Sequence, residues 1–486
     1  MNFTSLFKIG FTLGVLALGL WRAQAGETNF PANETWESIS HRWSMVPYET
    51  AKQKAEQGDA TAQYFVAWAC WDGSNKDEAI KWFKSAADKN LAAAQYRIGF
   101  MYQHGQGLET NYSKAIEWYL KSVGQGYANA EFDLGVMNCE GIGTTKDLAA
   151  AVKYFNLAAD QGNPYAENYL GGLYSSGWGV PKDLVKSVTY FQKAADSGFA
   201  QAQMNMGYAL ERGDGIQQDY VEAARYYRLA ADQGHSMAQN NLGHFYYDGL
   251  GVTRDVNEAM KWYQKSADQG QVWAESNLGW IYEHGDGIEH NHDLALKWTK
   301  AAAEKGFAKA QLQMGDLLEM KFDAKNQWVP DHAGAMEWYR KAAMQGVVEA
   351  MMKLGEQYFH QNAYDDIVTW YGMAVTNGNM EAAEQLGDLY RVNRPTSIPL
   401  PALVEELATV TLQAGGRDKI LLPQPGNIRV HDAKQLRLLL FSHRVCRRYH
   451  NLGHLGFDEM MQFTASLLFP SRFPIQHGVA VELNAI

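Results

Sequence analysis

Apolar and polar residues recur along most of the chain with a period of 36 residues. The phrase VKYFNLAADQG, which starts at Val152, returns at this spacing as VTYFQKAADSG, ARYYRLAADQG and MKWYQKSADQG. A fixed period in this range predicts an array of stacked structural repeats. Shortened, lengthened or partial copies before and after the regular ones extend the array over residues 59–393. Position 1 of the six regular repeats falls at Leu91, Tyr127, Asn163, Phe199, His235 and Gln271.

Each repeat contains two patterns that are typical of amphipathic helices. The first has small or apolar residues at positions 4, 8, 11 and 12, a spacing that defines one face of an α-helix, and a glycine at position 9. The second has alanine at position 25, aromatic residues at 28 and 29, and small residues at 32 and 33. A pair of glycines such as Gly105 and Gly107 separates the helices and lets the chain turn through φ > 0. One hairpin cannot bury its apolar face alone, so we expect the aromatic residues to pack between stacked neighbours.

These repeats resemble those of the Sel-1-like repeat family, a relative of the tetratricopeptide repeats. The resemblance is carried by AESNLGWIYEHGDG and DLALKWTKAAAEKG, both in the repeat that begins at Gln271, and by their counterparts in about nine copies. It implies an all-α, right-handed superhelical α-solenoid of stacked helix-turn-helix repeats. It also implies a protein-binding scaffold rather than a chemical reaction.

Three segments lie outside the array. Residues 1–25 contain one early lysine, an apolar run that ends at Leu20 and a final Ala-Gln-Ala, which is typical of a secretory signal peptide cleaved after Ala25. The alternative is an uncleaved anchor, although the run is short of the roughly 20 residues that a membrane span needs. Residues 26–58 are expected to form a lead-in and a capping helix. Residues 394–486, punctuated by proline and glycine, predict a small C-terminal helical module.

Composition limits the partners and the location. The formal net charge of −11 argues against nucleic-acid binding, which needs a basic face. No later segment has an apolar run long enough to cross a bilayer, so no membrane span is expected after signal cleavage. We therefore expect an exported protein, periplasmic or secreted in a bacterium. A role in the eukaryotic secretory pathway is the alternative, and the oligomeric state stays open.

Few residues suggest chemistry, and we expect no catalytic residues, no cofactor and no metal site. The sequence shows no Ser/His/Asp constellation. Cys70 and Cys139 lie two repeats apart, farther than the ~4.4–6.8 Å between the Cα atoms of a disulfide, so both are predicted to be free thiols. The alternative is an enzyme or metal-binding protein whose site lies in the C-terminal module. Its candidate ligands share one helical pattern but cannot close tetrahedrally from one straight helix: His443, Cys446, His450 and His454.

The candidate binding surface is the concave groove that the first helices would line. With positions 4, 8 and 12 in the core, positions 3, 6, 10 and 13 should face this groove. Their side chains vary between repeats and mix aromatic with polar groups, which suits an extended peptide or a protein loop. The alternative is that the aromatic residues only pad the contacts between neighbouring repeats. The candidate partner-binding residues are Tyr96, Phe100, Phe132, Tyr208, His244, Tyr247, Trp273, Trp280 and Glu283.

Together these features predict a non-catalytic, exported scaffold or adaptor that binds another protein in its groove. Resemblance to secreted members of the family implies a role in cell-envelope assembly, regulation or host interaction. The sequence does not select among these roles.

Overall fold

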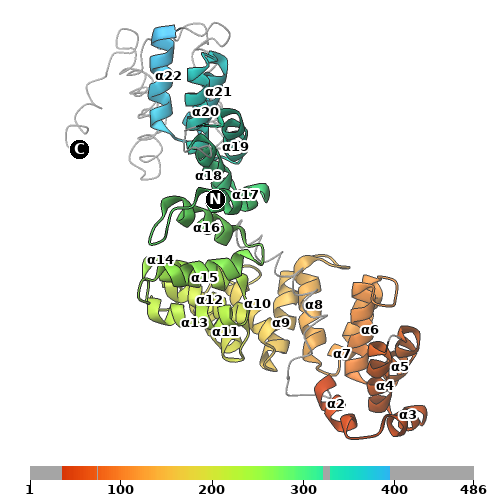
Figure 1. Ribbon diagram of the computed structural model, residues 1–486. Coiled ribbons are helices and arrows are strands. Elements are labelled where there is room, and N and C mark those ends of the chain that lie inside the picture. Colours follow the sequence, from red (N-terminus) through yellow and green to blue (C-terminus); the bar gives the residue numbers. More distant parts are fainter. Residues whose placement is uncertain (1–34, 74, 321–328, 394–486) are drawn as a thin grey trace, which may run out of the picture. The chain divides into compact units, whose positions relative to one another are not determined.

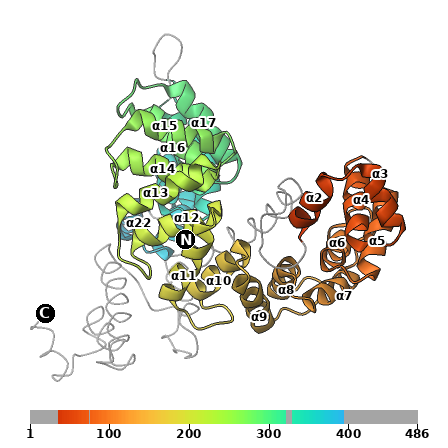
Figure 2. The same ribbon diagram turned by 90° about the horizontal axis from the view of Figure 1, so that it is seen from below.

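The computed structural model of the protein describes residues 35–73, 75–320 and 329–393. All regular elements in these ranges are α-helices, and consecutive helices pack against each other as antiparallel hairpins (Figure 1; Figure 2). The chain divides into two compact units between Ser266 and Ala267. The predicted all-α array of stacked hairpins is therefore confirmed.

The first unit contains two short N-terminal helices and six hairpins. Each hairpin has a first helix and a second helix that match the two patterns of a repeat. The helices are α2 (Trp36–Ser44) and α3 (Tyr48–Glu56), then the pairs α4 (Ala60–Asp72) and α5 (Lys76–Asp88), α6 (Ala92–His104) and α7 (Tyr112–Val123), α8 (Ala128–Glu140) and α9 (Leu148–Asp160), α10 (Pro164–Ser176) and α11 (Leu184–Asp196), α12 (Ala200–Arg212) and α13 (Tyr220–Asp232), and α14 (Ser236–Asp248) and α15 (Val256–Ala267).

The second unit continues the same architecture with three hairpins and one further first helix. These are α16 (Val272–His284) and α17 (His292–Glu304), α18 (Ala308–Glu319) and α19 (His332–Met344), α20 (Val348–His360) and α21 (Tyr364–Thr376), and finally α22 (Met380–Asn393). Between α20 and α21 the chain turns without the paired glycines, and Asn362 takes the left-handed conformation with φ of 57°. Asparagine tolerates this conformation better than most residues.

The two helices of a hairpin meet through the glycine at position 9 and the aromatic ring at position 29. A Cβ atom on Gly135 would lie 2.6 Å from two ring carbons of Phe155, and one on Gly207 would lie 2.7 Å from the ring of Tyr227. Both rings are fully buried. The missing side chain therefore makes the space that the ring fills, which explains why both residues recur in the sequence.

In five loops of the first unit, neighbouring hairpins meet through the second glycine of the loop. Gly105 and Gly107 have φ of 66° and 72°, as the sequence predicts. In the loop after α10, a Cβ atom on Gly179 would lie 2.7 Å from the Cβ atom of Leu148, at the start of the preceding second helix α9. This glycine thus serves close packing between repeats as well as the turn itself.

A polar contact at the start of each first helix also recurs. Position 5 carries glutamine in five of the nine repeats, and its Nε2 donates to a backbone carbonyl at the end of the preceding second helix. Gln63 donates to the carbonyl of Ala55 at 2.9 Å, and Gln239 donates to that of Ala231 at 3.1 Å. Because these side chains are buried, the hydrogen bonds satisfy groups that water cannot reach.

Helices α2 and α3 cover the exposed end of the first hairpin by packing on α4. The ring of Trp36 stacks on Phe65 with 6.3 Å between centroids, and the indole nitrogen of Trp43 donates to Thr61 Oγ1 at 3.2 Å. The sequence predicted a capping helix within residues 26–58, which corresponds to α3. It left the residues of α2 without an assigned structure. The predicted signal peptide and C-terminal module lie outside the described residues.

We expect Gly135→Ala to destabilise the protein by about 1–3 kcal/mol, because the added methyl group collides with the ring of Phe155. Urea unfolding followed by circular dichroism measures this. Adding Phe155→Leu should relieve the collision, so the double variant should lose less stability than the sum of the two single variants. Strict additivity would show that the two residues do not set the distance between α8 and α9.

Candidate functional site

Three of the nine candidate partner-binding residues lie in the core. Tyr96, Phe100 and Phe132 are only 4–6% exposed. Position 6 points toward the next repeat: Tyr96 packs 5.3 Å from Tyr127, and Phe132 packs 5.3 Å from Tyr169, between ring centroids. Burial removes these three residues from the surface that a partner can contact, as the alternative of padding between repeats proposed.

The register of the buried face explains this correction. Position 11 completes the core, whereas the expected core position 12 is half-buried in several repeats. From α12 to α20 the accessible line along the first helices is therefore shifted to positions 3, 7, 10 and 14, which we call the exposed stripe. In α6, α8 and α10 the residues at positions 3, 7 and 10 are buried. Position 11 is occupied in the regular repeats by Met101, Met137, Leu173, Ala209, Phe245 and Ile281, all buried.

The first unit presents three candidates near the ends of α12 and α14. Tyr208 is half-buried, and the guanidinium of Arg212 lies 5.5 Å from its ring centre. His244 is exposed, with Nδ1 3.3 Å from a carboxylate oxygen of Asp248. Tyr247 is half-buried at position 13, beside the stripe. These side chains combine aromatic surface with charged neighbours.

The second unit presents the other three candidates, all on α16. Trp273 is 42% exposed and lies 4.7 Å from Phe307 between ring centroids. Trp280 is half-buried and stacks on His284 at 4.1 Å. The carboxylate of Glu283 accepts a hydrogen bond from the histidine His292 at 3.0 Å. Partner binding by the six accessible candidates stays a prediction.

Amide side chains connect neighbouring first helices beside the stripe. Asn205 at position 7 donates to Asn168 at position 6 of the preceding repeat, at 2.8 Å. In the second unit the direction is reversed, since the hydroxyl of Ser276 at position 6 donates to Gln313 at position 7 of the following repeat at 2.8 Å. Sequence reasoning missed position 7, although polar residues there in successive repeats (Asn205, Asn241, Asn277 and Gln313) were a visible signal.

Groups with strongly shifted pKa values often mark active sites. Here they occupy packing positions. Burial raises the pKa values of Glu131 and Glu167, both at position 5, to about 7. Burial lowers the pKa of His235 to about 4, and its neutral ring caps α14 by accepting from the backbone N–H of Ala238 at 3.2 Å. The repeat packing accounts for these shifts without a reaction centre.

The two cysteines among the described residues are free and buried, as predicted. Burial raises the pKa of Cys139 to about 11, so it stays a protonated thiol at neutral pH. Cys446 and the neighbouring histidines of the alternative metal site, His443, His450 and His454, lie outside the described residues.

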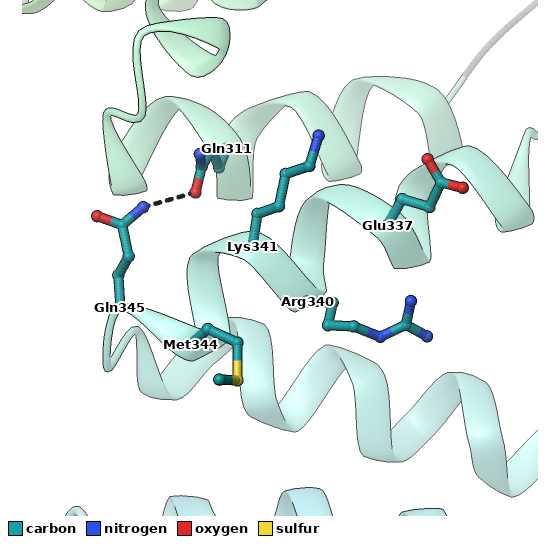
Figure 3. Close-up of a pocket in the computed structure, with 6 residues that line it drawn as sticks. All are labelled: Gln311, Glu337, Arg340, Lys341, Met344 and Gln345. Atoms are coloured by element: carbon teal, nitrogen blue, oxygen red, sulfur yellow. Dashed lines mark hydrogen bonds between the residues drawn. The ribbon is translucent and has the colours of Figure 1, made fainter.

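A shallow pocket of about 600 Å³ lies between α18 and α19 (Figure 3). Its wall includes Glu337, Arg340, Lys341 and the exposed Met344, and the hydrogen bond from Gln345 to Gln311 closes one side at 2.7 Å. In this hydrogen bond the position 5 side chain accepts, and the equivalent bond recurs in the first unit, where Gln233 donates to Gln203 at 2.7 Å. The charged groups have opposite signs, so the pocket does not select one charge.

One cluster could hold a metal ion among the described residues. Glu283, His290 and His292 bring one carboxylate and two imidazoles together, with ligand atoms all within 4.8 Å of one another. Sequence reasoning expected no metal site and assigned Glu283 to partner binding alone. The histidines at positions 20 and 22 of this repeat were the signal that it did not use.

Stacked hairpins, seven of the nine described with a glycine–aromatic contact, define an all-α repeat scaffold. The family model described as Sel1 repeat matches residues 60–91, 92–127, 128–163, 164–199, 200–235, 236–271, 274–307 and 308–347. The chain belongs to the Sel1 repeat family. Proteins of this family are typically non-catalytic, and their repeats generally mediate protein–protein interaction.

Two solved structures illustrate the relationship. One is the crystal structure of c5321, a protective antigen present in uropathogenic Escherichia coli strains displaying an SLR fold. It has 27% identity and a TM-score of 0.63, and the match covers 88% of this chain and 96% of that one. The second is a Sel1 repeat protein from Oxalobacter formigenes, with 31% identity, a TM-score of 0.46, and coverage of 49% and 96%. A search of curated proteins found no match.

Nothing in the described helices is both long and apolar enough to span a membrane.

We expect Glu167→Gln to stabilise the protein at pH 8.5 and to have little effect at pH 5. The folded-state pKa of about 7 exceeds the ordinary value of 4.5, so the folded protein binds more protons in between and loses stability as the pH rises through 7. Glutamine removes the buried charge and can donate as its counterparts do. Thermal unfolding at both pH values should show a midpoint raised by a few degrees at pH 8.5 only.

The reverse change, Gln203→Glu, provides the matched control. Gln203 stands at the same repeat position and is equally buried. Glutamate there should lower the midpoint at pH 8.5 more than at pH 5. The same response at both pH values, for either variant, would contradict the assignment of the shift to a buried charge.

Proposed function

We propose that the protein is an exported, non-catalytic scaffold that binds a protein partner through the exposed stripe of its first helices. The observation that carries this proposal is that the core positions of the first helices are constant between repeats while the exposed positions vary. Positions 4, 8, 9 and 11 repeat the same small or apolar residues in the core. The stripe at positions 3, 7, 10 and 14 differs from repeat to repeat, as a surface that recognises a specific partner would.

The side chains of the stripe suit an extended peptide or a protein loop. In the second unit, Trp273 presents an exposed indole. Trp280 follows seven residues later, about two turns further along the same face of α16. Aromatic anchors of this kind contribute much of the affinity at protein interfaces. Half-buried amides such as Asn277 and Gln313 lie alongside and can pair with a peptide backbone.

Export rests on the signal-like residues 1–25 and on likeness to c5321, which is described as a protective antigen. We therefore propose a location in the periplasm or outside a bacterium, with a role in envelope assembly, regulation or host interaction.

Site-specific photo-crosslinking in the native bacterium tests the binding surface. A photoreactive residue at Trp273, Trp280 or Tyr208 should form a crosslink to a second protein, because these positions lie on the stripe. Val185 and Val221 serve as controls, since both are 64% exposed but lie on the second helices α11 and α13. Crosslinks of equal yield at both sets of positions would refute a partner site on the first helices.

Mass spectrometry of the protein from cell fractions tests export. We expect the chain to begin at Gly26 and to be recovered from the periplasm or the medium, because the residues before it predict a cleaved signal peptide. Replacing Ala25 with the bulky Trp should block cleavage and leave the uncut chain with the membrane. A wild-type protein that keeps its N-terminal segment and stays in the cytoplasm would contradict export.

A further inference from the structure

We propose that Glu283, His290 and His292 bind a first-row divalent transition ion, with Zn²⁺ as the representative, and leave a coordination position open. This inference is independent of the proposed partner binding. It concerns the loop that joins α16 to α17, at one end of the hairpin.

Three different parts of one hairpin supply the ligands. Glu283 is the penultimate residue of α16, His290 lies in the loop, and His292 is the first residue of α17. His292 Nδ1 lies 3.0 Å from Glu283 Oε2, and His290 Nε2 lies 3.6 Å from the same oxygen. Zinc bonds of about 2.1 Å to nitrogen and oxygen place ligand atoms about 3.0–3.5 Å apart. The two distances from histidine to glutamate are therefore close to the spacing that coordination requires, and all three ligand atoms lie within 4.8 Å of one another.

The site combines two ligands that packing holds in place with one ligand that is free to rotate. The side chains of Glu283 and His292 are 14% and 19% exposed, so packing holds them in place. The His290 side chain is 56% exposed and can rotate to complete the site. Three protein ligands leave at least one position for water or for a group from another molecule, as in zinc sites built from two histidines and one glutamate.

The repeat frame does not require these histidines. At position 22, where this repeat has His292, the other regular repeats carry Tyr112, Leu148, Leu184, Tyr220 and Val256. At position 20, in place of His290, they carry Thr110, Lys146, Lys182, Gln218 and Arg254. The hairpin thus folds with aromatic or aliphatic residues at position 22 and with polar or basic residues at position 20. Histidines at both, opposite a carboxylate at position 13, occur together only here among the six regular repeats.

The following repeat offers a natural comparison. Glu319 at the end of α18 and His332 at the start of α19 form the same pair, with 3.1 Å between Oε2 and Nδ1. Pro330 stands two residues before His332, at the position where the repeat that begins at Gln271 has His290. Among the described residues this second pair has no third ligand, so it should bind the ion far more weakly.

The surroundings of His292 set the expected affinity. Its Nε2 is buried without a hydrogen-bond partner among the described residues. Histidine ligands usually donate their second nitrogen to a carboxylate or carbonyl, and loss of such a partner weakens metal binding by about 10–100-fold. We therefore expect micromolar rather than nanomolar affinity for Zn²⁺, enough to respond to changes in the concentration of free ion.

Equilibrium dialysis of the untagged full chain against Zn²⁺ tests the site. We expect His290→Lys, which introduces the residue found at Lys146 and Lys182, to weaken one equivalent of binding by roughly tenfold or more. Glu283→Gln should act in the same way. Far-ultraviolet circular dichroism should show that both variants keep the helical content of the wild type.

His332→Leu is the matched control and should leave Zn²⁺ binding unchanged, since no described residue supplies its pair with a third ligand. The His290→Lys variant with unchanged binding, or a wild-type chain that binds no Zn²⁺, would overturn the proposal. Binding that is lost in His450→Ala but kept in His290→Lys would assign the ion to the C-terminal residues and would equally overturn it.

Discussion

The contact between the position 9 glycine and the position 29 ring fixes how closely the two helices of a hairpin approach. Because the ring of Phe155 lies where the side chain of Gly135 would be, α8 and α9 pack with almost no room for change. Of the remaining faces of each helix, one packs against the next hairpin and one faces solvent. Each repeat inherits this geometry, so a single local fit is propagated along both units.

This frame limits where function can reside. Most aromatic side chains of the first helices in the early repeats are buried between packed helices, including Tyr96, Phe100 and Phe132. Variation without loss of the fold is possible only on the exposed stripe and in the loops. The later first helices expose more of their surface, with Trp273 as the largest exposed side chain on α16. The proposed partner surface and the carboxylate–histidine cluster occupy these two permitted places.

Polar groups within the frame follow the same rule. A buried glutamine at position 5 pairs with the preceding second helix, and where glutamate replaces it, as in Glu167, burial raises the pKa of the carboxyl. The raised pKa of such a glutamate therefore follows from its buried position in the repeat, where a charge is costly. By contrast, Glu283, His290 and His292 stand together in one repeat alone, so the frame does not account for them.

The sequence by itself determined the all-α repeat architecture, the hairpin boundaries and the role of Gly105 and Gly107, because each depends on local spacing that recurs in every copy. It also indicated that Cys70 and Cys139 do not pair. Tertiary structure alone decided which face of each first helix is free. Positions 6 and 7 are both adjacent to the core stripe on a helix, and on α12 only the packing of the next repeat buries Met204 while leaving Asn205 accessible. The convergence of Glu283 with two loop histidines likewise depends on how the chain turns between two helices, which periodicity does not encode.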